Sequence, residues 1–266
     1  MMKTNLFKAW LKFSNSNKSF TVGHTTQKPD IAKSNNSSKV QKIDFHTESE
    51  NKKSKQPTSV SNTNTEIIKN ITIELEKIND LEDLFHYIKN LPYCPLKNFA
   101  QNTVLFDGNK NSKIMLIGEA PGEDEDIEGR PFCGKSGKLL DNILNTFFLD
   151  RTKIYITNVL PWRPPANRKP SLEEINMFKP IVEKHISLIN PELIIAIGST
   201  AMTCLLDDGN KISENTGNVF EYNNSFLKTS KKLTVIYHPA FLIRNYKMKK
   251  KTWQDIIKIQ NETQLF

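Results

Sequence analysis

Four short apolar segments, each followed at once by polar residues, set the pattern of the C-terminal two-thirds of the chain. They lie in KIMLIGEAPG, KIYITNVLPW, LIIAIGST and LTVIYHPAF. Strands that are apolar at almost every position are typical of a parallel sheet that is buried on both faces. Segments with helical periodicity alternate with them: SGKLLDNILNTFFL, SLEEINMFKPIVEKHISLI, TAMTCLL and, at the end, MKKKTWQDIIKIQNE. The alternation predicts an α/β fold, a three-layer αβα sandwich around a four-stranded parallel sheet.

A helical segment precedes this alternation. Apolar residues recur at helical spacing from Thr65 to Leu91, in two pieces, and prolines follow. Residues 1–63 are rich in Ser, Asn, Thr and Lys and poor in aliphatic residues, which predicts disorder apart from a short helix near the N-terminus. We therefore divide the chain into a tail, residues 1–63, and one folded domain, residues 64–266, in which 64–92 form the helical lead-in.

The net charge of +8 is concentrated in the tail. Residues 1–63 contain 11 lysines against four acidic residues, so the rest of the chain is nearly neutral. Two interpretations stay open for the tail: a solvated linker, or a segment that contacts nucleic-acid phosphates without sequence preference.

Cysteine usage and hydropathy bear on the compartment. The three cysteines, Cys94, Cys133 and Cys204, lack the spacing of a metal site. No apolar run approaches the length of a membrane span. We expect a reducing, cytoplasmic setting and no membrane partner.

Polar motifs follow the four apolar segments: GEAPGEDED, TN with PWRPPANRKP, GST and HPAFLIRN. The carboxyl ends of parallel strands share one edge of the sheet, and ligands of α/β folds bind there. GEAPGEDED lacks the G-K-[ST] of a phosphate-binding P-loop, and consecutive carboxylates in a loop diverge too much for a metal site. We expect Glu119 to lie in the crevice, and Glu123, Asp124 and Asp126 to face water.

Three other side chains and one helix start could carry chemistry at this edge. The amide of Asn158 offers a donor and an acceptor, which suits the edge of a base but also the cap of a turn. Phe132, in a Gly-rich loop, is either a core plug or a stacking face for a planar ligand. His238 is structural or catalytic, and its neighbours favour catalysis. The helix that opens at Gly134–Gly137 has free N–H groups that can hold a phosphate.

These residues resemble a known family. GEAPG, ED, GRPF.GKSG.LLD, YITNVLPWRPPANRKP, GSTA and HPAFLIR, in this order, resemble the uracil-DNA glycosylase superfamily and are most similar to its iron–sulfur (type 4) branch, from about Cys94 to Ile257. The resemblance implies a monofunctional hydrolase that flips uracil out of DNA and cleaves its N-glycosidic bond, starting base-excision repair. It also implies that the protein has the fold of this family, binds uracil-containing DNA and is a monomer.

The resemblance implies a role for each pocket residue. Phe132 stacks on the uracil ring, and Gly118 lets the backbone approach it. Asn158 pairs with N3–H and O4 of uracil, a pattern that cytosine presents with reversed polarity. His238 donates a hydrogen bond to O2, where negative charge develops as uracil leaves as an anion.

Two carboxylates and a set of DNA contacts complete the implied site. Glu119 helps to orient the attacking water. Related enzymes carry an aspartate where this chain has Ala120, so water activation is less direct and stabilisation of the leaving group should bear more of the barrier. Glu125 crowds the C5 side of the pocket and so excludes thymine. Leu242 or Ile243 would enter the duplex as a wedge. The residues implied to contact DNA are Gly134, Lys135, Ser136, Ser199, Thr200, Leu242, Ile243, Arg244 and Lys247–Lys251.

The type 4 branch holds its cluster with four cysteines, and this chain departs from that pattern. Cys94 occupies one of the four ligand positions, whereas the other three are occupied by Leu91, Trp162 and Phe178. Cluster binding needs an almost full set of thiolates. We therefore expect no iron–sulfur cluster, no other cofactor and no metal, with Trp162 and Phe178 filling the vacated volume as an aromatic plug.

Two other functions stay open beside the uracil-DNA glycosylase. One is a catalytically silent nucleic-acid-binding module that keeps the fold. The other is a glycosylase that accepts a wider range of deaminated bases, such as hypoxanthine or xanthine.

Overall fold

The computed structural model describes residues 60–266 except for 93 and 207–210. The short helix near the N-terminus, and most of the disorder that we expect in the tail, concern residues that lie outside this range. The expectation of disorder is wrong for residues 60–63, which are helical. Helix α2 begins at Val60, a few residues before the expected start of the lead-in. In the part of the chain that the structure describes, no helix is both long and apolar enough to cross a bilayer.

The central sheet has six strands in the order β1-β3-β2-β4-β6-β5. The four inner strands are parallel, as the four apolar segments predict. The prediction of a four-stranded sheet is wrong, because β1 and β5 add an antiparallel strand at each edge. Both are short and only half buried, so their sequences lack a strong apolar signal. The strands are Asp107–Gly108 (β1), Ile114–Gly118 (β2), Tyr155–Asn158 (β3), Leu193–Ile197 (β4), Val219–Tyr222 (β5) and Lys231–Ile236 (β6).

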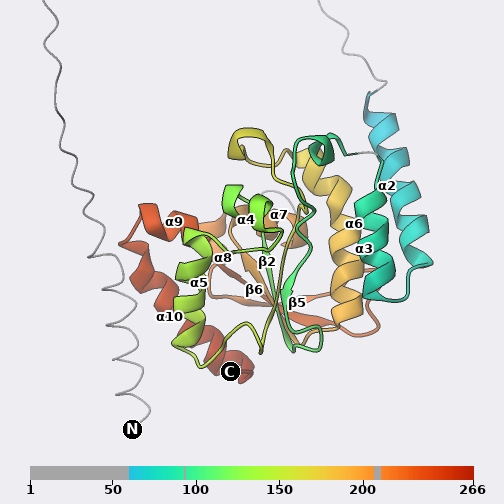
Figure 1. Ribbon diagram of the computed structural model, residues 1–266. Helices are drawn as coiled ribbons and strands as arrows, with labels where there is room; N and C mark the ends of the chain where they lie inside the picture. The colour runs from blue at the N-terminus through green and yellow to red at the C-terminus, as the bar shows by residue number, and fades with distance from the viewer. Residues whose placement is uncertain (1–59, 93, 207–210) are drawn as a thin grey trace, which may run out of the picture.

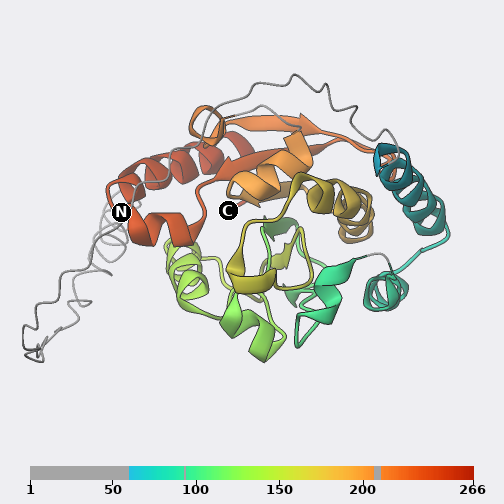
Figure 2. The same ribbon diagram turned by 90° about the horizontal axis from the view of Figure 1, so that it is seen from above.

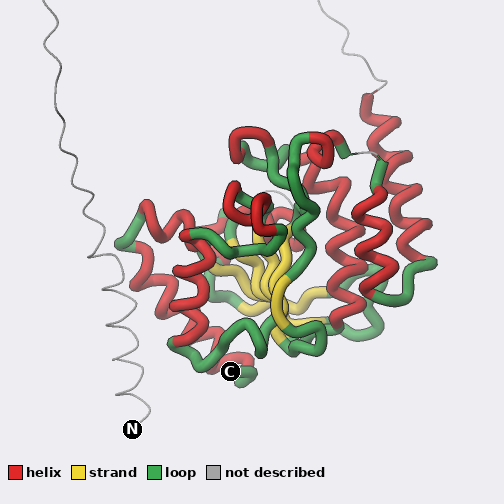
Figure 3. Tube along the Cα trace, in the orientation of Figure 1, coloured by secondary structure: helices red, strands yellow, loops and turns green. Residues whose placement is uncertain are grey.

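Helices cover both faces of the sheet (Figure 1). In β2, Met115 and Ile117 point into one core, whereas Ile114 and Leu116 point into the other. Figure 2 shows the same two helical layers from above, and the strands form the centre between the helices in Figure 3. On one face pack α2 (Val60–Glu76), α3 (Leu81–Asn90), α6 (Leu172–Ile189) and α7 (Ser199–Leu206), and on the other α5 (Lys135–Asn145) and α10 (Met248–Thr263).

Helix α6 begins as its sequence predicts. The Ser171 side chain accepts a hydrogen bond from the backbone N–H of Glu174, and the Glu174 carboxylate accepts one from the N–H of Ser171. This reciprocal capping box satisfies two donors that a helix start otherwise leaves unpaired. The helix then carries Phe178 and His185 into the core.

Several short helices lie between the main elements, and two of them replace segments expected as loops. The acidic run after Gly122 forms α4 (Glu123–Glu128), with four acids in its first turn, where the helix dipole favours negative charge. The segment after β6 forms α9, with Pro239 at its first position. The short helices are η1 (Pro95–Asn98), α4, η2 (Pro165–Asn167), α8 (Ile212–Asn215) and α9 (Pro239–Arg244).

Candidate active site

The carboxyl ends of the parallel strands meet at one edge of the sheet, as expected. Gly118 at the end of β2 is the register partner of Asn158 at the end of β3. Gly198 follows β4 and donates its N–H to the carbonyl of Ile236, at the end of β6, at 2.9 Å. His238 lies two residues beyond. The ends of β2, β3, β4 and β6 thus bring glycines, an amide and an imidazole together.

Asn158 presents an unused acceptor at this edge. Asn158 is 7% exposed, and its buried Oδ1 atom has no hydrogen-bond partner among the described residues. A side chain at Gly118 would overlap this oxygen, so glycine is required opposite Asn158. Since buried polar atoms are almost always paired, an orphan acceptor at a strand end points to a ligand that donates to it.

The ring of Phe132 lies beside this amide. A Cβ atom added to Gly118 would lie 2.6 Å from Phe132 Cζ, so the ring packs directly on the glycine. The ring also stacks on His238, with 5.6 Å between ring centroids and 28° between planes. Phe132 is buried and belongs to the core on the α5 side. The ring is therefore part of the core and also a wall next to Asn158 and His238.

His238 is the N-cap of α9 and is held as a neutral imidazole. Its Nδ1 atom accepts a hydrogen bond from the N–H of Ala240 at 3.1 Å. Burial, and then the charge of Arg244, lower the pKa of His238 to about 4. In the neutral ring the proton is on Nε2, because Nδ1 is the acceptor. His238 thus offers a neutral N–H donor.

Glu119 is anchored by a residue of another strand end. The hydroxyl of Thr200, in the first turn of α7, donates a hydrogen bond to Glu119 Oε2. The carbonyl of Glu119 accepts the N–H of Leu160 at 3.1 Å. Thr200 is buried and Glu119 is half buried, so the carboxylate has a fixed position at this edge of the sheet. The resemblance implies a DNA contact for Thr200, whereas the structure gives it a bond to Glu119.

Comparison with known proteins identifies the family of this chain. The profile of the Uracil DNA glycosylase superfamily matches residues 105–257, more than half of the chain. The chain belongs to this superfamily. The type-4 uracil-DNA glycosylase of Pyrobaculum aerophilum is 36% identical over 167 residues, which are 62% of this chain and 85% of the relative. That of Thermotoga maritima is also 36% identical, over 62% of this chain and 84% of the relative. That of Saccharolobus solfataricus is 35% identical over 69% and 86%.

In this superfamily member, Glu125 ties two turns together. Its Oε2 atom accepts the N–H of Gly122 at 3.1 Å, and its Oε1 atom accepts the N–H of Gly134 at 3.0 Å. The N–H of Gly134, expected to hold a phosphate, is therefore already used. Asp124 also lies against Gly134, close enough that its carboxylate would overlap an added Cβ. At the start of α5, the exposed Lys135 and the half-buried Ser136 stay accessible for DNA.

Asp126 does not face water, and this expectation is wrong. The residue is 2% exposed. Its Oδ1 atom accepts the N–H groups of Gln101 at 2.9 Å and Asn102 at 3.1 Å. The acidic residues form helix α4, in which side chains three or four residues apart lie on the same face. The inward face of this helix carries Asp126, which packs against the loop before β1. Glu123 and Asp124 are exposed, as expected.

The segment around α9 separates the two side chains implied as a wedge. Leu242 is fully buried in the core, whereas Ile243 is 41% exposed beside the exposed Arg244. Of the pair, Ile243 is free to enter a duplex. Ser199 is exposed at the end of β4. Among the lysines expected to bind phosphates, Lys249 is 3% exposed, so this member of the set faces the protein.

The corner that holds the cluster in type 4 enzymes is apolar in this chain. Leu91, Cys94, Trp162 and Phe178 are all buried in the same core. The rings of Trp162 and Phe178 meet edge to face, 5.8 Å apart, and Trp162 Nε1 donates to Thr103 Oγ1 at 3.1 Å. Three of the four side chains have no atom that ligates iron, so this corner does not fit a four-cysteine cluster.

The other cysteines give no alternative ligand set. Cys133 and Cys204 lie elsewhere in the fold, and burial raises their pKa values to about 11 and about 12. Burial also raises the pKa of Cys94, so all three favour the neutral thiol. Within the described ranges, no group of three or more His, Cys, Asp or Glu side chains is placed to hold a metal ion.

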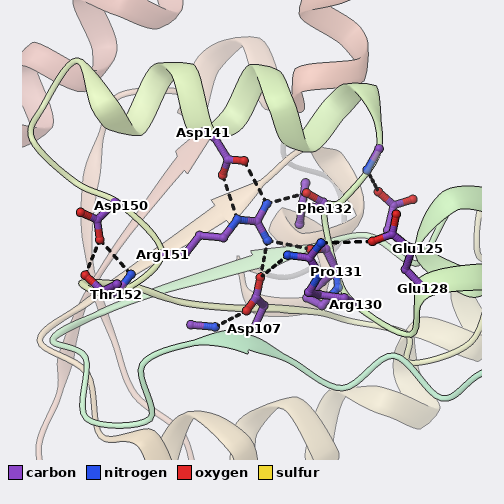
Figure 4. A network of polar contacts seen from close by, with 12 residues as sticks. Asp107, Glu125, Glu128, Arg130, Pro131, Phe132, Asp141, Asp150, Arg151 and Thr152 are labelled. Atoms are coloured by element: carbon purple, nitrogen blue, oxygen red, sulfur yellow. Dashed lines mark hydrogen bonds and ion pairs between the residues drawn. The ribbon is translucent and has the colours of Figure 1, made fainter.

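One side chain that the motifs do not include reaches the back of the site. Arg151, in the turn before β3, donates to the backbone carbonyls of Pro131 and Phe132 and pairs with Asp107 and Asp141 (Figure 4). Sequence reasoning missed it, because an isolated arginine between a helix and a strand has no signature. The Asp in LLD, which is Asp141, was part of the family resemblance without an assigned partner.

We expect acid to destabilise the protein through two histidines. Burial lowers the pKa of His185 to about 3, and that of His238 is about 4. Both are about 6.5 in the unfolded chain, so that state takes up protons first and the free energy of unfolding falls as the pH drops below about 6.5. The slope approaches about 2.7 kcal/mol per pH unit for the two groups together, and above about pH 6.5 this contribution is constant.

Urea unfolding at a series of pH values between about 7.5 and 5 measures this slope. The variant His238→Gln removes one of the two groups and should halve it. Equal slopes for the variant and the parent protein would contradict the assignment to His238.

Proposed function

We propose that the protein is a uracil-DNA glycosylase that flips uracil out of DNA and hydrolyses its N-glycosidic bond to leave an abasic site, the first step of base-excision repair. The observation that carries this proposal is the buried, unpartnered Oδ1 of Asn158 opposite Gly118. Uracil can donate N3–H to this oxygen and accept from the amide at O4, whereas N3 of cytosine is an acceptor. The type-4 uracil-DNA glycosylases among the relatives support the same substrate.

The chemistry follows from three side chains. The ring of Phe132 stacks on the flipped base, and His238 donates its Nε2–H to uracil O2. As the bond between C1′ and N1 breaks, the electron pair goes to the base, and a neutral donor aimed at O2 stabilises this anion. Water adds its oxygen to C1′ and loses a proton. Glu119, fixed by Thr200, orients this water and accepts the proton.

DNA binding uses both sides of the crevice. Ile243 enters the space that the base leaves, beside Arg244, because Leu242 is held in the core. Lys135, Ser136 and Ser199 contact phosphates, and Glu125 limits the pocket on the C5 side of the base. We further propose that the protein acts as a monomer in the cytoplasm, and that residues 1–63 add a contact to DNA without sequence preference.

We also infer that the enzyme works without an iron–sulfur cluster. The packed pair of Trp162 and Phe178 fills the volume between α6 and the loop after β3, which supports this inference. A protein purified under anaerobic conditions should be colourless and free of iron. A brown protein with stoichiometric iron would overturn the inference.

The release of uracil from single-stranded DNA tests the proposed function. We expect abasic sites to form in an oligonucleotide with one uracil, and none in the same oligonucleotide with cytosine or thymine. Binding of the DNA without release would instead support the silent module. Release of hypoxanthine or xanthine at a similar rate would support the wider glycosylase.

Thr200 provides a prediction about water activation. Thr200→Val keeps the shape of the side chain but removes the donor to Glu119, so the carboxylate loses its fixed position. We expect kcat for uracil release to fall about 10-fold, with KM unchanged, because a misplaced carboxylate affects the chemical step more than binding. Thr200→Ser keeps the hydroxyl and should restore most of kcat. Equal rates for the Val and Ser variants would contradict this role.

A further inference from the structure

The ring at the centre of the site is carried by a strained backbone. Phe132 has a φ of 52°, in the left-handed region. A bulky residue there is uncommon and strained, so other contacts must hold it. In an ordinary conformation with negative φ, the same residue would direct its side chain elsewhere. The position of the ring against Gly118 and His238 therefore depends on what fixes this part of the chain.

Arg151 supplies this restraint. Its Nη2 atom donates to the carbonyl of Phe132 at 2.5 Å, and its Nη1 atom donates to the carbonyl of Pro131 at 3.1 Å. The two carbonyls lie on either side of the N–Cα bond about which φ of Phe132 is measured. One planar guanidinium therefore binds both peptide groups that define this conformation, which a single ammonium group cannot do.

The guanidinium is itself fixed by two carboxylates from different elements (Figure 4). Asp141 on α5 accepts from Nε at 3.0 Å, and Asp107 on β1 accepts from Nη1 at 2.5 Å. The side chain of Arg151 is 21% exposed, so these pairs are partly shielded from water. Gly137 completes the arrangement, because a side chain there would overlap the Phe132 carbonyl.

We propose that Arg151 is a positioning residue for base stacking: it holds the peptide groups of Pro131 and Phe132 so that the Phe132 ring stays beside Asn158 and His238. The proposal rests on the proposed function in taking Phe132 as the ring that stacks on uracil. Its structural part, the control of the Phe132 conformation, does not depend on the substrate. Asp107 and Asp141 act through Arg151 and not on the base.

A double-mutant cycle tests the functional part. We expect Arg151→Met to lower kcat/KM for uracil release about 10²-fold, since a displaced ring misplaces the base. If Arg151 acts through Phe132, the double variant Arg151→Met/Phe132→Ala is no slower than Phe132→Ala alone. Losses that multiply would show that Arg151 supports the fold in general, and would overturn the proposal.

The matched control is Arg130→Met. Arg130 belongs to the same network, 3.8 Å from Asp107 and 3.1 Å from Glu128, and no bond from it to the carbonyls of Pro131 or Phe132 is found in the described structure. This variant removes the same charge and should keep the activity of the parent protein. A loss equal to that of Arg151→Met would assign the effect to charge, against the proposal.

The variant Arg151→Lys keeps the positive charge, and its crystal structure tests the positioning role independently of the substrate. A negative φ at Phe132, with the ring turned from Gly118, supports the proposal whether or not uracil is the substrate. A φ near that of the parent protein overturns it. If the structure changes as expected while the parent protein releases no uracil, the proposed function fails and the positioning role stands.

Discussion

His238→Ala should lower kcat for uracil release by about 10²–10³-fold, the usual loss when one donor to a developing anion is removed. In the proposed mechanism, Nε2–H of the neutral ring stabilises uracil O2 in the transition state, and alanine offers no donor. Single-turnover release from a single-stranded oligonucleotide measures the chemical step. His238→Gln, whose amide can donate, should recover part of the rate.

An exposed histidine provides the control for this experiment. His86 on α3 is exposed and bonded to Asn90 on the same helix, so His86→Ala should release uracil at the rate of the parent protein. Circular dichroism and a melting curve show whether the His238 variant is folded. A folded His238→Ala protein within a few-fold of the parent rate would mean that another group stabilises the leaving base.

Phe178→Ala should lower the free energy of unfolding by about 3–5 kcal/mol, the range for an aromatic side chain removed from a packed core. Phe178 is fully buried, and its ring supports Trp162 in the corner where type 4 enzymes hold their cluster. The loss is a large fraction of the stability of an ordinary domain, about 5–15 kcal/mol. Denaturant unfolding at neutral pH measures it.

Leu172→Ala is the matched control for this loss. Leu172 begins the same helix α6 but is 44% exposed, so its truncation should change the free energy of unfolding by less than about 0.5 kcal/mol. Addition of iron and sulfide during purification should not change the stability of either the parent or the Phe178 variant. A Phe178→Ala protein as stable as the Leu172 variant would mean that the corner is loosely packed.

The inner sheet could be predicted from the sequence because burial on both faces leaves an uninterrupted apolar signal. Residues such as Leu116 and Ile195 have no polar neighbour in their strands, and a short apolar run of this kind is typical of a strand buried on both faces. The edge strands could not be found in this way, since β1 has two residues and β5 is half exposed. Their pairing is decided by neighbours that are distant in sequence, not by their own composition.

The convergence of the candidate residues on one edge of the sheet could also be predicted. Strand ends of a parallel sheet must share an edge, so the meeting of Gly118, Asn158 and His238 followed from the order of the motifs. Details set by tertiary contacts did not. The inward turn of Asp126, the burial of Leu242 and the reach of Arg151 depend on which face of a short helix or turn meets the core.

The unpaired oxygen of Asn158 has a consequence for how stability and function are balanced. A buried acceptor without a partner destabilises the free protein, so an apolar residue of similar size at this position would give a more stable molecule without the means to recognise uracil. Under the proposed function, bound uracil supplies the missing donor and cytosine does not. Base selectivity and the stability of the free protein would then oppose each other at a single atom.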